Sequence, residues 1–252
     1  MLFYWFLKFV GIGPAVRGAF RPRAEGTEHV PADGAVIIAS NHLSAADWIF
    51  MPLSIRRRVT FLAKAEYFTG SGVKGFLQRA FFSGAGQVPI DRTSASAAED
   101  AIQTGLRILR DGQILGIYPE GTRSPDGRLY RGKIGVARMA LQTGVPVVPV
   151  AMCYSHRKLP FGGKIMRVRV RFGEPLDFSR YDGLAGDRFV ERSITDEIMY
   201  EIMTLSDQEY VDVYGATVKK SMSSGGSAAD AVATLQPPVT EAADRAPTTL
   251  AG

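Results

Sequence analysis

Short apolar runs recur through the middle of the chain and constrain its fold more than any other feature. They occupy residues 35–39, 59–63, 114–118 and 145–151, and each has the length and composition of a buried strand. Amphipathic segments lie between and after them, at residues 97–112, 133–143 and 187–205. Because strands alternate with helices, the sequence predicts an α/β domain over residues 25–218. We expect a mixed, largely parallel central sheet flanked by helices.

Two later segments refine the predicted sheet. The run at residues 145–151 contains Pro146 and Pro149. Since a proline cannot donate to a strand ladder, we expect an edge position or irregular pairing there. Residues 166–172 alternate apolar side chains with arginines, which predicts one buried face and the exposure of Arg167, Arg169 and Arg171.

Residues 1–24 are rich in aromatic and apolar side chains and form a separate N-terminal segment. A charge and helix breakers interrupt it, so it lacks the roughly 20 continuous apolar residues of a spanning helix. We expect a helical segment that docks on a membrane and turns its cations toward anionic lipid, namely Lys8, Arg17, Arg21 and Arg23. The protein would then be membrane-associated, on the cytoplasmic face of the cell membrane. The alternative is a first helix packed on the core.

The C-terminal segment, the net charge and the single cysteine each limit what the chain can be. Residues 219–252 are mostly small and polar without an apolar period, which predicts a disordered, low-complexity tail. The net charge of +5 suggests an anionic partner: nucleic acid, a membrane surface or a phosphorylated substrate. The single cysteine, Cys153, excludes an internal disulfide, and its apolar surroundings indicate a core role.

His42 and Asp47 follow the first apolar run, where a strand ends and the chain turns into its next element. Catalytic side chains commonly occupy such loops, because a rigid scaffold holds them. A histidine takes a proton near neutral pH, and a nearby carboxylate fixes its tautomer. Considered alone, however, the two residues fit a structural hydrogen-bonded pair better than a catalytic one.

Cofactor and metal signals are weak. Residues 70–75 match G-x-G-x-x-G, but Asp91 follows too closely for the acidic residue of a dinucleotide site. His29 and His156 are isolated from other ligand-type residues. We therefore expect neither a bound cofactor nor a metal.

Two further loops follow predicted strands and add cations. One contains Arg92, and the other contains Gly121, Thr122 and Arg123. If these loops share one rim of the sheet with His42, guanidinium groups, a hydroxyl and a closely approaching backbone would surround an anion. A base beside a bound phosphate suits the activation of a neighbouring alcohol.

Four sequence blocks resemble those of the glycerolipid acyltransferases, the lysophosphatidic acid acyltransferase group. Residues 41–47 resemble the H-x4-D block and residues 88–92 the second block. Residues 118–124 resemble F-P-E-G-T-R-S, with Tyr118 for the usual phenylalanine, and residues 145–150 resemble the fourth block. Four blocks in order are far more specific than any one. The resemblance implies an α/β fold and transfer of a fatty acyl group, from acyl-CoA or acyl carrier protein, to the hydroxyl of a lysophospholipid such as 1-acylglycerol-3-phosphate.

The resemblance also implies a role for each matching residue. His42 would deprotonate the acceptor hydroxyl, and Asp47 would orient His42. The acceptor phosphate would be bound by the remaining set: Arg92, Glu120, Gly121, Thr122 and Arg123. Because Glu120 has the wrong charge for a phosphate, we expect it to hold Arg123 or another cation in place. Ser44 lies in no G-x-S-x-G elbow, so we expect it to shape the loop.

The implied partners are membrane lipids, the acyl donor and the lysophospholipid, and no nucleic acid. Three other functions stay open. The acceptor could be glycerol-3-phosphate, another lysophospholipid or a glycolipid. The protein could bind lipid without catalysis, or it could hydrolyse acyl thioesters.

Overall fold

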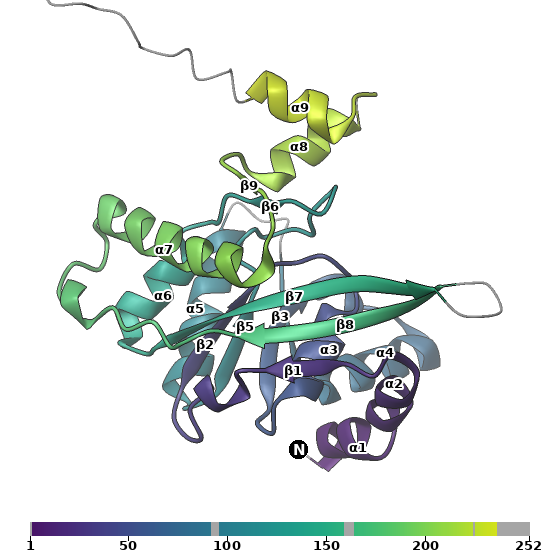
Figure 1. Cartoon of the computed structure of the whole chain (residues 1–252). Helices are drawn as coiled ribbons and strands as arrows, with labels where there is room; N and C mark the ends of the chain where they lie inside the picture. Colours follow the sequence, from purple (N-terminus) through teal and green to yellow (C-terminus); the bar gives the residue numbers. More distant parts are fainter. Residues whose placement is uncertain (1, 92–95, 159–163, 224, 236–252) are drawn as a thin grey trace, which may run out of the picture.

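A seven-stranded sheet forms the centre of the protein (Figure 1). The structure is a computed structural model that describes residues 2–91, 96–158, 164–223 and 225–235. The strand order is β1-β8-β7-β2-β5-β3-β4. The strands are β1 (Arg23–Glu25), β2 (Val36–Ser40), β3 (Val59–Lys64), β4 (Gln87–Ile90), β5 (Ile114–Ile117), β7 (Val147–Lys158) and β8 (Lys164–Phe172). Only the β7–β8 pairing is antiparallel, so the predicted mixed, largely parallel sheet is confirmed.

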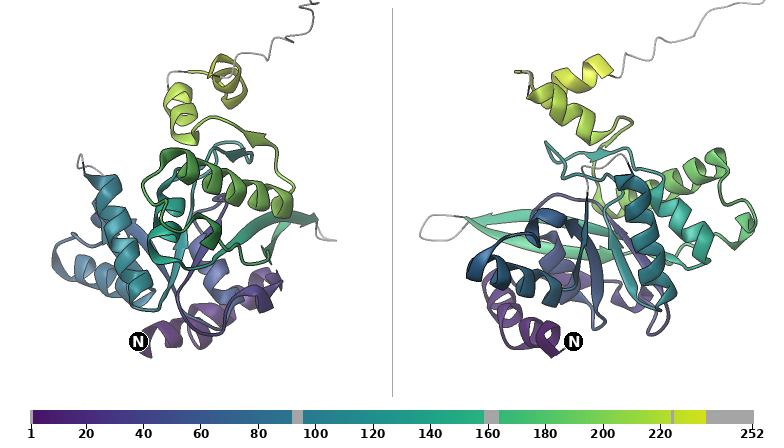
Figure 2. Two further views of the ribbon diagram at one scale, coloured as in Figure 1. Left: turned by 90° about the vertical axis from the view of Figure 1, so that its left-hand side faces the viewer. Right: turned by 180° about the vertical axis from the view of Figure 1, so that it is seen from behind.

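Helices cover both faces of this sheet (Figures 1 and 2). Because side chains alternate along a strand, Ile37 and Ala39 of β2 pack in one core and Val36 and Ile38 in another. The first core is closed by α5 (Ala97–Arg110), α6 (Gly135–Thr143) and α7 (Arg188–Ser206). The second is closed by α2 (Ile12–Phe20) and α3 (Asp47–Ser54), and α4 (Gly72–Gly84) packs beside β4. Short 3₁₀ turns complete the domain: η1 (Thr27–His29), η2 (Ala65–Tyr67) and η3 (Ser179–Tyr181).

The position of β7 corrects one expectation. Despite its prolines, β7 lies inside the sheet, between β8 and β2. The carbonyl of Pro149 accepts a hydrogen bond from the N–H of Gly173, just past the end of β8. The N–H that a proline lacks would point to this same side, where the β7–β8 ladder has a gap, so Pro149 is tolerated. Pairing resumes only at the Val147–Leu176 bridge. The edge position was therefore wrong, whereas the irregular pairing is observed.

The N-terminal segment folds into α1 (Leu2–Phe9) and α2. Lys8 was expected at a lipid surface, but it is buried and its Nζ donates to the carbonyls of Arg56 and Arg57. Burial, together with the charge of Arg17, lowers the pKa of Lys8 to about 8. Arg17 donates to the carbonyls of Lys8 and Leu53. These two cations thus fasten the helices to the domain, because they satisfy carbonyls at chain turns.

Apolar side chains nevertheless remain exposed on this part of the molecule. They come from α1 and the following turn, and from α4: Leu2, Phe3, Phe6, Phe9 and Val10, with Val73, Phe76 and Leu77. Within the described ranges, no helix has both the length and the apolar character needed to cross a bilayer.

The C-terminal segment also departs from expectation. Residues 219–235 were predicted to be disordered, but they belong largely to α8 (Gly215–Met222) and α9 (Ala228–Leu235). A small core holds the two helices, in which Val218 and Ala231 pack with Tyr130. This core lies beside a two-stranded sheet, β6 (Leu129–Tyr130) with β9 (Tyr210–Val211). The sparse apolar residues had no visible period because each helix spans only about two turns. The prediction for residues 236–252 lies outside the described residues.

Candidate active site

His42 and Asp47 form a close pair at the end of β2. His42 Nδ1 lies 2.7 Å from Asp47 Oδ2, and the same oxygen accepts from the backbone N–H groups of Leu43 and Ser44, each at 2.9 Å. Asp47 is fully buried. An ionised carboxylate only accepts hydrogen bonds, so Nδ1 carries the proton and Nε2 keeps a free lone pair. The loop therefore presents an oriented base.

The loop itself is fixed to the sheet at its first residue. Asn41 is buried, and its side-chain amide exchanges two hydrogen bonds with the backbone of Met152 on β7, at 2.7 and 3.1 Å. Ser44 Oγ accepts from the Ala46 N–H, in keeping with a role in shaping the loop. The side chain of Asn41 thus extends the contact between β2 and β7 by one residue beyond the end of β2.

Two tyrosines surround the pair, and sequence reasoning missed both contacts. Tyr154, on β7, donates its hydroxyl to Asp47 Oδ1. Burial and the charge of Asp47 raise the pKa of Tyr154 well above its usual value, so it stays a donor. Tyr118 stacks on the His42 ring with centroids 4.0 Å apart. No hydrogen-bond partner for the buried Tyr118 hydroxyl exists among the described residues.

Glu120 makes backbone contacts that the sequence does not predict. It is buried, and instead of holding Arg123 it accepts from two backbone N–H groups, His42 to Oε2 and Tyr130 to Oε1, both at 3.0 Å. Burial raises its pKa to about 7, while these hydrogen bonds oppose the rise. No cation in the described ranges lies at ion-pair distance from it. Glu120 therefore joins the His42 loop to β6, and the charge of Lys219 acts on its carboxylate.

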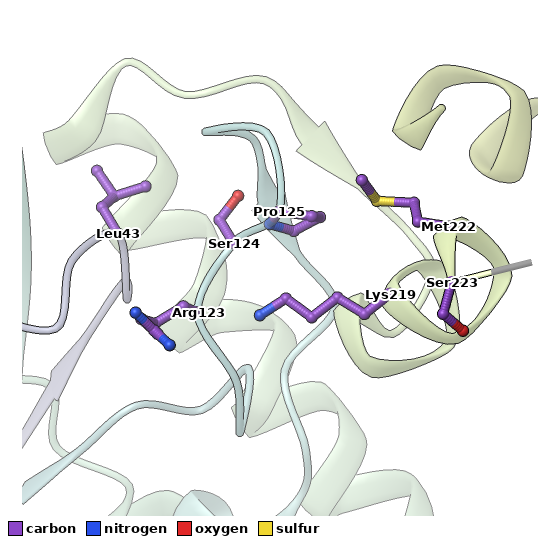
Figure 3. Close-up of a pocket in the computed structure, with 7 residues that line it drawn as sticks. All are labelled: Leu43, Arg123, Ser124, Pro125, Lys219, Met222 and Ser223. Atoms are coloured by element: carbon purple, nitrogen blue, oxygen red, sulfur yellow. The ribbon is translucent and has the colours of Figure 1, made fainter. Parts of the chain in front are cut away.

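The loop after β5 lies directly beside the His42 loop. The N–H of Ser124 donates to the His42 carbonyl at 2.7 Å. Gly121 has φ of +71°, a conformation that favours glycine, and a side chain there would meet Lys133. Arg123 and Leu43 line one pocket of about 480 Å³ (Figure 3). The structure thus brings His42, Asp47, Glu120, Gly121, Thr122 and Arg123 to one rim.

The remaining predicted ligand, Arg92, lies outside the described residues. Its neighbour Asp91 is exposed at the end of β4, the edge strand, with β3 and β5 between β4 and β2. Among the residues that the structure describes, no three His, Cys, Asp or Glu side chains gather in a way that could hold a metal ion.

The chain is similar in sequence to known proteins. A profile of the Acyltransferase family matches residues 21–153. The chain is 30% identical over 190 residues to the chloroplastic 1-acyl-sn-glycerol-3-phosphate acyltransferase LPAT1 of Arabidopsis thaliana, covering 73% of this chain and 52% of that protein. It is 31% identical over 155 residues to the 1-acyl-sn-glycerol-3-phosphate acyltransferase of Bacillus subtilis (strain 168), covering 59% of this chain and 70% of that protein.

A solved structure is also similar. The crystal structure of the 1-acyl-sn-glycerophosphate (LPA) acyltransferase PlsC from Thermotoga maritima superposes with a TM-score of 0.52 at 26% identity, covering 79% of each chain. The present chain spans about half the length of the plant relatives that it matches. Because the family profile covers more than half of its 252 residues, the protein belongs to the Acyltransferase family.

Proposed function

We propose that the protein is a 1-acylglycerol-3-phosphate O-acyltransferase. It moves a fatty acyl group from acyl-CoA or acyl carrier protein to the free hydroxyl of 1-acylglycerol-3-phosphate, giving phosphatidic acid. The observation that carries this proposal is the 2.7 Å contact of His42 with the buried Asp47, beside a pocket lined by Arg123. Both relatives are named for the same acceptor, which supports this choice.

The geometry supports a single-displacement reaction. His42 Nε2 removes the proton of the acceptor hydroxyl as its oxygen attacks the thioester carbonyl, and Asp47 stabilises the imidazolium. The tetrahedral intermediate then expels the donor thiolate, and Nε2 transfers the proton of the acceptor hydroxyl to this thiolate. The new ester bond replaces the thioester bond, and no acyl-enzyme is formed.

A membrane surface is the second proposed partner, because both lipids of this reaction are amphiphilic. The exposed aromatic side chains of α1, Phe6 and Phe9, would enter the lipid headgroup region. Co-sedimentation with anionic vesicles should weaken at least about tenfold in a Phe6→Asp/Phe9→Asp variant, given about 1.5–3 kcal/mol for burying each ring. Tyr200→Asp, at an exposed position on α7, is the matched control. Unchanged sedimentation of the double variant would place the membrane contact elsewhere.

The activity itself is tested with a panel of acceptors and one acyl-CoA, with products resolved by mass. We expect phosphatidic acid from 1-acylglycerol-3-phosphate, and a loss of about 10²–10⁴-fold in His42→Ala. His156→Ala, at an exposed histidine of β7, should keep wild-type activity. Faster acylation of another acceptor in the panel would show that 1-acylglycerol-3-phosphate is not the preferred substrate. Acyl-CoA hydrolysis without acceptor would indicate a thioesterase, and full activity of His42→Ala would overturn the assigned base.

A further inference from the structure

Helix α8 lies close to the loop that follows β5, although α8 comes after β9 in the sequence. Gly215, at its start, approaches Thr122 and Tyr130 so closely that an added side chain would touch both. Val218 is fully buried in the small core around Tyr130. These contacts fix the rotation of α8 about its axis, and therefore the direction of the next residue, Lys219.

Lys219 points across the pocket beside the His42 loop. Its Nζ donates to Thr122 Oγ1 at 2.9 Å, and its stem lines the pocket with Arg123 on the facing side (Figure 3). Leu43 and Ser124 line the same pocket, and Ser124 is hydrogen-bonded to His42. The pocket thus adjoins the base and carries cations from two distant parts of the chain.

Among the described residues these cations form no salt bridge, although the charge of Glu120 acts on Lys219. Within the described ranges, no carboxylate lies at ion-pair distance from Arg123, Lys219 or the nearby Lys133. The nearest buried acid, Glu120, is occupied by two backbone N–H groups. Desolvation and the charge of Arg123 lower the pKa of Lys219, as expected for two cations that face each other, while the charge of Glu120 opposes this shift. An anion between them would relieve this repulsion.

We propose that Lys219 binds the acceptor phosphate together with Arg123, so that α8 supplies one half of a phosphate clamp. This inference rests on the proposed function and names a specificity-determining residue for it. In 1-acylglycerol-3-phosphate the phosphate-bearing carbon adjoins the carbon with the free hydroxyl. A hydroxyl at His42 therefore requires its phosphate in a neighbouring pocket. Both cations can donate charge-assisted hydrogen bonds to phosphate oxygens.

Lys219→Met and Lys220→Met test this assignment as a matched pair, because Lys220 is the exposed next residue of the same helix. Lys219→Met should raise the apparent KM for 1-acylglycerol-3-phosphate by about 10–100-fold, the loss of one charge-assisted hydrogen bond. The KM for acyl-CoA should stay unchanged. Lys220→Met should match the wild type, and Lys219→Arg should recover most of the affinity.

Equilibrium binding separates this inference from the proposed activity. Calorimetry in the His42→Ala background measures affinity for 1-acylglycerol-3-phosphate and for the uncharged 1-acylglycerol without turnover. Adding Lys219→Met should weaken only the phosphorylated lipid. Equal loss for both lipids would show that Lys219 merely holds α8 in place, and no loss for either would overturn the clamp. In that last case wild-type transfer to 1-acylglycerol-3-phosphate would leave the proposed function standing. Absence of wild-type transfer would instead refute the function.

Discussion

The two sides of the candidate site are built in opposite ways. Around His42 the buried carboxylates are satisfied by the protein: Asp47 accepts four hydrogen bonds, and Glu120 accepts two. Around Arg123 and Lys219 the cations face an open pocket, and the lysine donates a hydrogen bond to Thr122. The His42 side is therefore held by buried hydrogen bonds before any ligand arrives, whereas the Arg123 side forms no salt bridge among the described residues.

This difference separates orientation from affinity. A base must be held in one tautomer and one direction, which requires buried partners with fixed geometry. A phosphate site gains specificity when its cations are partly exposed and unpaired in the free protein, because the ligand then supplies the missing charge. Changes on the His42 side should alter kcat, and changes on the Arg123 side should alter the KM of the acceptor.

The largest effect should come from Asp47→Asn. An amide cannot fix the Nδ1–H tautomer of His42 as a carboxylate does, so we expect kcat to fall about 10²–10⁴-fold while the acceptor KM changes little. Steady-state kinetics with 1-acylglycerol-3-phosphate measures both constants. Asp33→Asn, at an exposed position, is the control. A raised acceptor KM with a normal kcat in Asp47→Asn would contradict the proposed division, in which the His42 side affects kcat and the Arg123 side affects KM.

Glu120→Gln should change the pH dependence of stability. The folded pKa of about 7 exceeds the ordinary value of 4.5, so the stabilisation due to this group is complete below pH 4.5 and is lost as pH rises through 7. The free energy of unfolding should fall by about 3 kcal/mol more in the wild type than in the variant across this range. Chemical denaturation at several pH values measures it, with the exposed Glu66→Gln as control. Parallel wild-type and Glu120→Gln profiles would contradict the raised pKa.

The smallest effects are expected from two tyrosine-to-phenylalanine variants, each of which removes one hydroxyl group near His42. Tyr154→Phe removes a donor to Asp47 Oδ1, which should lower kcat about tenfold, the value of one hydrogen bond to a charged group. Tyr118→Phe removes a buried hydroxyl that has no partner in the described structure. It should leave kcat unchanged and stabilise the fold by up to about 1 kcal/mol. Kinetics and thermal unfolding of both variants decide this, and equal loss of kcat in the two would refute the distinction.

Local patterns in the sequence were sufficient for the α/β class and for the His42 loop. The period of α7 is visible because Ile194, Ile198 and Ile202 recur on one face, and Asp187 caps its start as such residues do. His42 and Asp47 meet because they are only five positions apart along the chain. Patterns of this kind depend only on neighbours along the chain, so they can be recognised without coordinates.

Other features depended on partners that are remote in sequence, and only the tertiary structure decided them. Tyr154 lies 107 residues from Asp47, and Lys219 lies 97 residues from Thr122. Neither shows a local signal, since a tyrosine in an apolar strand and a lysine in a polar segment are both ordinary. Lys8 was assigned to the wrong partner because burial, not residue type, determined what it could contact. By itself the sequence determined the main strands and helices of the α/β domain and the order of the loops, whose causes are local, but not α8 and α9. Folding determined which charges are buried and which remain free to bind, because burial depends on what the rest of the chain packs against each residue.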